Sequence, residues 1–482
     1  MPGVYRLIFL VTLVLLINFG LKAQPNSFYF MKGVVQTKDM NPAKHGLESG
    51  YYVSLPFASK LDVSANTNNW NYNDLVHKGT GLQKDSMVWD FEQLLNAFDK
   101  DNFVQESASL TWAEFGWKKK EKFYSFSVSE NEVAEPFFQK ELAEFLFYGN
   151  APLIGKKFYS GQFGVLAQHY RQFAFTYSKV NSKKFTTGIT GKLLFGMAGM
   201  DTRGVNFVTD MPSSGDQIHL SGNGNLYLSG PLAITQHPEN AYDLQFSSTY
   251  TTLGYLLNFG NPGLAVDLGF TYKIRKHLEL SASVVDLGFI SWNNNLSTFA
   301  DSGNFPYEGL QLNMPGENPP TADSFQPLID NLKDSLLNAF PLALSGQRFA
   351  TLLPVKLYLG AEYMLTKKVS LAALARIRWF KNQLHGSYTA SLNTALGKNF
   401  SFSAAYSYYE STRNNLGVGL SCRVNALQLY AATDNILSPF YPNKASNLNL
   451  RVGINFIFPE PDRIEQRRNL FVPKVKNKYH RF

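Results

Sequence analysis

The sequence predicts a closed, antiparallel transmembrane β-barrel of about 14 strands, and at most about 16. Three observations predict it: an export leader, long segments in which every second residue is apolar, and tight turns that alternate with longer loops. We expect a lumen segment at the amino end and short helices in the loops. Along the chain, these parts are a signal peptide (1–23), the lumen segment (24–50), the barrel (51–458) and a basic periplasmic tail (459–482).

The leader has the order of a secretory signal peptide. Arg6 precedes an apolar run from Leu7 to Ile17, and Ala23 supplies a small residue for cleavage before Gln24. The alternative is a membrane anchor, but the run is shorter than the roughly 20 residues that a helix needs to cross a bilayer. Since no later run of 18 apolar residues follows, we expect export to the outer membrane without a transmembrane helix.

Composition narrows the class of protein further. The 482 residues are 44% hydrophobic and 17% charged, which excludes intrinsic disorder. The net charge of +8 is spread along the chain, which argues against a nucleic-acid surface. Cys422 is the single cysteine, so an internal disulfide and cysteine-based zinc or iron–sulfur sites are excluded.

The strand prediction depends on a period of two. From Leu448 to Phe458 every even-numbered residue is apolar, and residues 264–274 repeat the pattern. Strands of this length match a tilted membrane crossing of about 9–11 residues. The same alternation occurs in 355–363, 369–379, 400–408 and 416–424.

The connections between these segments carry independent information. Tight turns are expected at 275–277, 366–368 and 397–399 and near Asn425, and the segments between them include the long connection 292–352. Barrels of the outer membrane have short periplasmic turns and longer outer loops. We therefore place the tight turns and the carboxyl end in the periplasm.

A soluble β-sandwich also alternates. The barrel is favoured by export without disulfides, by the number of candidate strands and by a 15% aromatic content suited to interfacial girdles. Lipid solvates an apolar face but not a free strand edge, so the sheet must close.

Helical spacing is confined to the connections. Phe91, Leu94, Leu95 and Phe98 share one helical face, and Pro136 suits the first turn of a second helix. Residues 323–340 predict an amphipathic helix in the long outer connection.

Several segments resemble a known family. These are NPGLAVDLGFTYKIRKHLELSASVVDLGFISWNNN (261–295), LQLYAATDNIL (427–437), NLNLRVGINFIF (447–458) and the tripeptide Asn41-Pro42-Ala43. They resemble an outer-membrane barrel family catalogued as a domain of unknown function. More distantly, the chain is similar to FadL-like long-chain fatty-acid transporters and to barrel subunits of a bacterial secretion and gliding system.

The resemblance covers nearly all of the mature chain and implies a fold more than a function. It implies a barrel of about 14 strands whose lumen is plugged by residues 24–50, with Asn41, Pro42 and Ala43 as the plug motif. The chain departs from such transporters because it continues from Phe458, where they usually end, to Phe482. The position of the assembly signal is therefore left open.

Nothing in the sequence predicts an enzyme. The HExxH and GxSxG motifs are absent, and the eight histidines lack metal-ligand spacing. No metal and no cofactor is expected. The remaining alternative is a barrel hydrolase with Ser and His on its outer wall, since such pairs are spatial neighbours rather than sequence neighbours.

One set of lumen residues is a candidate ligand site. A turn centred at Thr366-Lys367 sets Lys356 across from Arg376 or Arg378, and the next hairpin sets His385 opposite Arg378. We expect a basic patch near the outer mouth that binds a carboxylate or phosphate, with arginine donating in a fork. In the alternative, the cations pair with Glu362, Asp267 or plug carboxylates.

Two functions follow from these expectations. The first is passive transport of hydrophobic or amphipathic small molecules across the outer membrane, with lipid around the barrel and such a molecule as ligand. The second is a scaffold or docking subunit of an envelope secretion or surface-attachment complex. The basic tail 459–482 either docks on a periplasmic or envelope partner by charge or is merely solvated.

Overall fold

The computed structural model describes most of the chain. Described are residues 26–56, 58–68, 70–79, 81, 84, 86–148, 155, 157–210, 218–236, 242–246, 254–255, 258–307, 343–380, 383–397, 399–409, 412–438 and 440–458. The predicted signal peptide, the helix expected at 323–340 and the basic tail lie outside this part.

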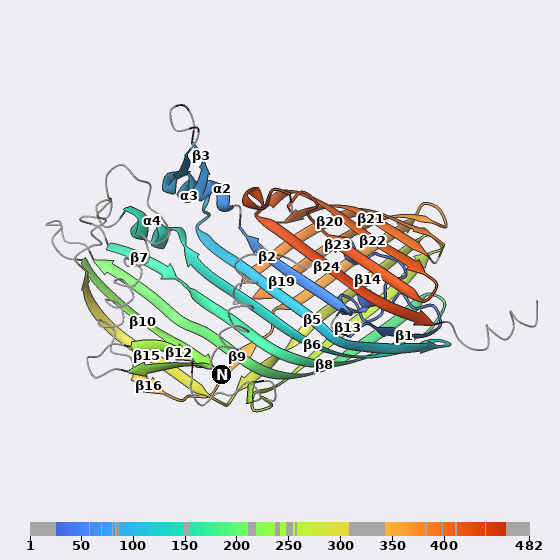
Figure 1. Cartoon of the computed structure of the whole chain (residues 1–482), viewed down its shortest axis with the longest axis horizontal. Helices are drawn as coiled ribbons and strands as arrows, with labels where there is room; N and C mark the ends of the chain where they lie inside the picture. Colours follow the sequence, from blue (N-terminus) through green and yellow to red (C-terminus); the bar gives the residue numbers. More distant parts are fainter. Residues whose placement is uncertain are drawn as a thin grey trace, which may run out of the picture.

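Fourteen antiparallel strands close into a barrel within the described residues, which decides between the two predicted counts (Figure 1). The first position is shared by β1 (Gly50–Ser54) and β2 (Lys60–Thr67), both of which pair with β5 on one side and β24 on the other. The next six positions are β5 (Asp101–Lys119), β6 (Lys122–Gln139), β8 (Gly164–Val180), β9 (Phe185–Asp210), β13 (Pro262–Arg275) and β14 (Leu278–Trp292).

The remaining seven strand positions close the barrel. The eighth position is shared by β17 (Phe349–Leu352) and β18 (Val355–Met364), which both pair with β14. The last six are β19 (Val369–Phe380), β20 (Gln383–Leu396), β21 (Phe400–Tyr409), β22 (Thr412–Val424), β23 (Leu427–Thr433) and β24 (Asn447–Phe458).

Alternation of side chains explains why the sheet closes. On β13, Leu264, Leu268 and Phe270 are exposed on the outside, whereas Ala265 and Asp267 are buried on the inside. An apolar exterior is stable in lipid, where unpaired strand edges are not tolerated. The alternative of a soluble β-sandwich is thereby excluded.

The predicted tight turns are confirmed. β13 and β14 are separated by two residues, as are β22 and β23, where Asn425 takes a positive φ of 55°. We call this end of the barrel the turn end and the opposite end the loop end.

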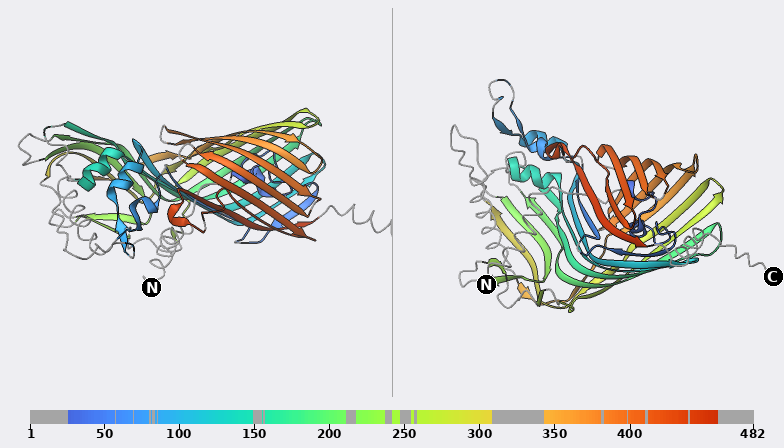
Figure 2. Two further views of the ribbon diagram at one scale, coloured as in Figure 1. Left: turned by 90° about the horizontal axis from the view of Figure 1, so that it is seen from above. Right: turned by 45° about the vertical axis from the view of Figure 1, so that its right-hand side comes forward.

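At the loop end, the sheet extends beyond the closed barrel (Figures 1 and 2). β9 has 26 residues; its first half pairs with β13, and its second half pairs with β10 (Ile218–Ser229) and β7 (Lys157–Gln162). β10 in turn pairs with β15 (Leu296–Tyr307), which pairs with β16 (Ala343–Ser345). A separate hairpin consists of β11 (Leu232–Gln236) and β12 (Tyr242–Phe246).

Trp292 fills the lumen where this extension leaves the barrel. It is fully buried, and a Cβ at Gly196 or Gly199 would lie 2.5 or 2.6 Å from its ring. Its indole N–H donates to Thr351 (2.8 Å), and its ring stacks on Phe349. The two glycines therefore make room for the tryptophan.

Short helices cover part of the loop end. They are α2 (Tyr72–Leu75), α3 (Phe91–Ala97) and α4 (Lys140–Tyr148), with the hairpin β3 (Val76–Lys78) and β4 (Met87–Trp89) and the 3-10 turn η5 (Pro442–Lys444). The predicted face of α3 is confirmed, since Leu94, Leu95 and Phe98 pack in one buried cluster. Among the described residues, no helix combines the length and apolar character needed to span a membrane.

The prediction that Pro136 begins a helix is wrong. Pro136 lies within β6, and α4 starts four residues later. Proline lacks an N–H for the strand ladder, and Pro136 lies in a gap of the pairing between β5 and β6, between Ala134 and Phe137. The missing donor is therefore tolerated there.

Candidate functional site

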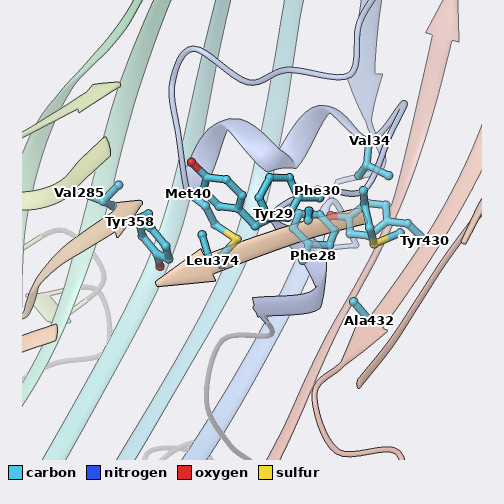
Figure 3. Close-up of a cluster of buried hydrophobic side chains, with 12 residues drawn as sticks. Phe28, Tyr29, Phe30, Val34, Met40, Val285, Tyr358, Leu374, Tyr430 and Ala432 are labelled. Atoms are coloured by element: carbon cyan, nitrogen blue, oxygen red, sulfur yellow. The ribbon is translucent and has the colours of Figure 1, made fainter. Parts of the chain in front are cut away.

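Residues 26–49, which we call the plug, fill the lumen toward the turn end of the barrel (Figure 2). The plug contains two 3-10 turns, η1 (Asn26–Phe28) and η2 (Val35–Asp39), and lies inside the wall (Figure 2). Phe28, Tyr29 and Met40 are buried against wall residues that include Tyr358 and Tyr430 (Figure 3). Such burial of apolar surface holds the segment in the lumen.

The motif Asn41-Pro42-Ala43 lies at the tightest contact between plug and wall. The Asn41 side chain accepts a hydrogen bond from the Ala43 N–H (2.9 Å) and donates one to the Tyr29 hydroxyl (2.9 Å). A Cβ at Gly188 would overlap the Pro42 backbone, and one at Gly269 would overlap the Asn41 amide. The motif therefore docks where two adjacent wall strands carry no side chain.

This contact predicts that Gly188→Val loosens the plug. Overpacking a close contact costs about 1–3 kcal/mol, so we expect trypsin to cleave the folded protein at Lys38 or Lys44 roughly tenfold faster or more. Gly191→Val is the matched control, because nothing lies within 4 Å of a Cβ there. Equal cleavage of both variants, each still showing the heat-dependent gel shift of a barrel, would contradict the proposed contact.

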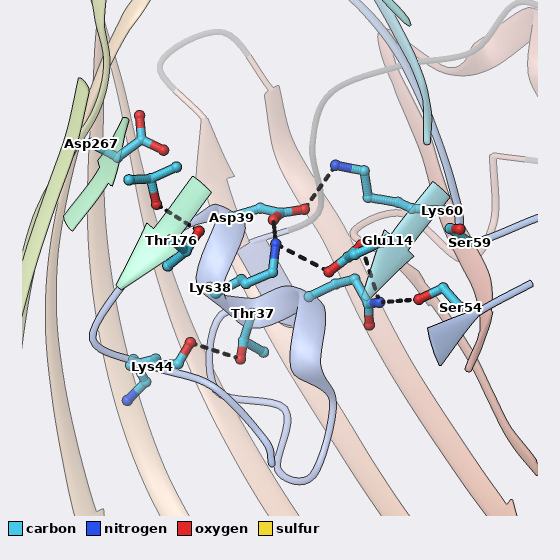
Figure 4. A network of polar contacts seen from close by, with 12 residues as sticks. Thr37, Lys38, Asp39, Lys44, Ser54, Ser59, Lys60, Glu114, Thr176 and Asp267 are labelled. Carbon is cyan, nitrogen blue, oxygen red and sulfur yellow. Dashed lines mark hydrogen bonds and ion pairs between the residues drawn. The ribbon is translucent and has the colours of Figure 1, made fainter. Parts of the chain in front are cut away.

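Buried charges also join the plug to the wall (Figure 4). Lys38 lies 2.9 Å from the Asp39 carboxylate and 3.1 Å from that of Glu114 on β5, and Lys60 on β2 reaches Asp39 at 2.7 Å. Gln36 donates to Asn455 on β24 (2.8 Å). Because buried charges are stable only when paired, these contacts fix the plug in one orientation.

His45 makes the plug sensitive to pH. Its ring stacks on Phe123 of β6 with centroids 4.2 Å apart, and burial together with the positive charge of Lys118 lowers the pKa of His45 to about 3. When the plug is released, the pKa of His45 returns to its ordinary value of 6.5. Because the released plug then binds a proton that the docked plug does not, the docked plug loses stability as pH falls from 6.5 toward 3.

We expect hydrogen exchange of the plug around His45, corrected for its intrinsic pH dependence, to increase up to about tenfold per pH unit in this window. His45→Phe keeps an aromatic ring on Phe123 but has no titrating group, so its exchange should stay flat. An identical acid response of variant and parent would assign the effect to another group.

The amino-terminal end of the plug is held by Asp434. This fully buried carboxylate accepts the backbone N–H groups of Asn26 (2.5 Å) and Ser27 (2.8 Å) and the hydroxyl of Tyr409 (2.5 Å). The Asn26 amide also donates to Ser387 on β20 (3.0 Å). Asp434 belongs to the segment 427–437 that carries the family resemblance, but nothing in the sequence predicted its contact with Asn26, which lies 408 positions away.

The four residues of the predicted basic patch are neighbours across three strands. The register pairs Lys356 with Arg378, Arg378 with His385, and Arg376 with Tyr358. Lys356 forms an ion pair with Asp286 (2.8 Å), and Arg378 forms one with Glu135 (2.6 Å).

The carboxylates in these pairs differ from those expected. Asp286 and Glu135 take the places proposed for Asp267 and Glu362, and Glu362 instead pairs with Lys32 of the plug (2.8 Å). The register counted from the sequence did not predict that Asp286 faces Lys356, because Asp286 lies in a β-bulge with a positive φ of 62°.

Two cavities divide the patch. The larger, of about 390 Å³, is the loop-end cavity, and it is lined by Arg376, Arg378 and His385 together with Asn66, Asn68, Asp99, Asp101, Phe103, Gln105, Leu384, Gly386, Ser387 and Tyr409. The smaller, of about 80 Å³, lies deeper and is lined by Lys356 and the charges around Asp267 and Asp286. The smaller cavity has a mainly polar surface, whereas the loop-end cavity combines charged and amide groups with a larger share of apolar surface.

A charged network surrounds the smaller cavity. Lys192 on β9 contacts Asp267 on β13 (2.8 Å) and Asp286 on β14 (2.5 Å), and Asp286 also contacts Lys356 on β18. We call these four residues the wall network. It ties together four consecutive strands of the wall, β9, β13, β14 and β18.

Within the described part of the chain, no group of three or more His, Cys, Asp or Glu side chains could hold a metal ion. Cys422 is exposed.

These features define the class of protein: a fourteen-strand barrel of transmembrane type with an amino-terminal plug and a cavity of mixed polar and apolar lining on the plug's loop-end side. The chain belongs to a family of unknown function (DUF5723), whose model matches residues 42–434. A search of curated proteins found no match.

Solved structures with a similar arrangement are distant. They include the Ralstonia pickettii toluene transporter TbuX (TM-score 0.39, 8% identity, 87% of this chain and 93% of that one). The P. putida toluene transporter TodX follows with a TM-score of 0.38 at 10% identity, over 87% and 93% of the two chains. A Pseudomonas aeruginosa FadL homologue has a TM-score of 0.37 at 10% identity, over 91% and 94%.

Proposed function

We propose that this chain is an outer-membrane protein that lets small amphipathic molecules with an anionic group pass from the loop end, past the plug, to the periplasm. The leader supports export, and the apolar exterior supports a place in lipid. The proposal includes the tail 459–482 as a periplasmic segment.

One observation carries the proposal: the loop-end cavity ends on residues that hold the plug. Ser387 and Tyr409 line the cavity, and they contact Asn26 and Asp434, respectively. A molecule bound in this cavity therefore competes directly with the contacts that keep the plug docked. Charged and amide groups lie beside apolar surface in this cavity, and such a mixed lining favours amphipathic molecules over purely hydrophobic ones.

The test is uptake by proteoliposomes. The probe is an arylalkyl sulfonate, such as 4-phenylbutanesulfonate, which stays ionised and crosses lipid slowly. We expect uptake well above that of protein-free liposomes. Uptake equal to that of empty liposomes by a protein with a normal barrel gel shift would overturn the proposal.

A scaffold without transport is the second candidate. The plug fills the inner lumen, and the strands β7, β10, β15 and β16 extend the sheet beyond the barrel, where they offer a surface for an envelope partner. This candidate predicts no uptake of the sulfonate together with stable co-purification of envelope proteins.

A further inference from the structure

The loop-end cavity contains one buried cation that the fold leaves without a counter-charge. Arg376 is 6% exposed, its buried Nε has no hydrogen-bond partner, and no ion pair joins it to another described residue. Its nearest aromatic contact is Tyr358, whose ring centroid lies 6.0 Å from the guanidinium carbon. Burial of an unpaired guanidinium destabilises a protein by roughly several kcal/mol unless an anion or water binds to it.

The neighbouring cations differ in this respect. Arg378, two residues along the same face, is neutralised by Glu135 at 2.6 Å, and Lys356 by Asp286 at 2.8 Å. The fold thus supplies a carboxylate for each cation beside Arg376 but, within the described ranges, none for Arg376 itself. The larger cavity lies at this residue.

A second donor faces the same cavity. His385 lies on β20 beside Arg378, its ring packs on Phe103 with centroids 4.6 Å apart, and its buried Nε2 has no hydrogen-bond partner. In the tautomer with Nε2 protonated, it donates a hydrogen bond to an anion. Phe103 provides an apolar surface for the rest of a ligand.

The cavity also contains acidic residues. Asp99 and Asp101 line it, but both are exposed, and they accept hydrogen bonds from Asn68 (3.3 Å) and Gln139 (3.0 Å). Water screens exposed carboxylates far more than a buried arginine. The acids therefore mark the hydrated mouth of the cavity, and Arg376 marks its buried floor.

We infer that Arg376, assisted by His385, is the binding site for the carboxylate of an amphipathic small molecule. The guanidinium receives the two carboxylate oxygens in a fork, and the apolar part of the molecule lies against Phe103. This inference rests on the proposed function for its biological meaning, but binding is measured separately from transport.

The experiment uses the whole protein in lipid nanodiscs, with 4-phenylbutyrate as probe and 4-phenylbutyramide as its neutral isostere. We expect the wild type to bind the carboxylate about tenfold or more tighter than the amide, the range for a charge-assisted hydrogen bond. Arg376→Gln should remove this preference while leaving amide binding unchanged, and Arg376→Lys should retain part of it.

Arg348→Gln is the matched control, because it removes the same charge from an exposed position at the loop end. It should keep the full preference for the carboxylate. A preference that survives in Arg376→Gln, or that Arg348→Gln abolishes equally, would overturn the site. Carboxylate-selective binding without sulfonate uptake would leave the site standing and refute transport alone, whereas uptake without selective binding would do the reverse.

Discussion

Deleting residues 26–47 should convert a closed barrel into an open channel. In planar bilayers, the intact protein is expected to conduct almost no current, because the plug buries side chains against the wall strands β1, β6, β14, β18, β19, β23 and β24. A barrel of this strand number is too wide for wall side chains alone to fill. The deletion variant should therefore show discrete, long-lived conductance steps.

The same deletion exposes polar wall groups that the plug now satisfies. Glu114, Asn455 and Ser283 each lose a partner in the plug, and water entering the lumen replaces those partners. We therefore expect the variant to remain a heat-modifiable barrel. Gly188→Val should give brief openings and Gly191→Val none. A deletion variant that folds but stays closed would show that wall or loop residues, rather than the plug, seal the pore.

The wall of the barrel could be predicted because it follows local rules. Alternation over residues 369–379 predicts a strand that the structure gives as Val369–Phe380, and the adjacent tight turn fixes which residues face each other. Counting outward from Thr366-Lys367 predicted Arg376 or Arg378 across from Lys356, and the structure has Arg378 there. Register in a two-sided sheet is set by pattern and turn length.

The contents of the lumen could not be predicted in this way. Asp434 and Asn26 meet across the whole length of the chain, and Lys192 meets Asp286 at a bulge that shifts the register. Such contacts depend on closure of the barrel, which no local pattern encodes. Two glycines in the sequence could have indicated where the plug contacts the wall. Gly188 and Gly269 lie at inward positions of long strands, and a missing side chain there indicates that another part of the backbone approaches closely.

The four residues of the basic patch have different roles, because register predicts which of them are neighbours but not which carboxylates pair with them. The registry argument brought Lys356, Arg376, Arg378 and His385 together correctly as neighbours, but it gave all of them one purpose. The structure pairs Lys356 with a carboxylate of the wall network and Arg378 with Glu135, so both are bound up in holding strands together. Arg376 and His385 are left facing the cavity that ends on the plug.

Replacing Lys192 with methionine should destabilise the barrel strongly. The change leaves Asp267, whose side chain is 2% exposed, without its cation, and leaves Asp286 with Lys356 alone. Removing one partner from a buried ion pair typically costs about 3–5 kcal/mol. We expect a loss of this size in the free energy of unfolding, measured by urea titration of the protein in lipid vesicles.

The control is Lys273→Met on the adjacent strand β13. Lys273 is 57% exposed and lies 3.9 Å from Glu279, and exposed pairs contribute about 0–1 kcal/mol. Combining Lys192→Met with Asp267→Asn should recover part of the loss, because the amide keeps the hydrogen bond from the Asp286 N–H (2.8 Å) without a buried charge. If Lys192→Met were no more harmful than Lys273→Met, the wall network would not hold the strands together, and the fit of the plug would have to supply that stability.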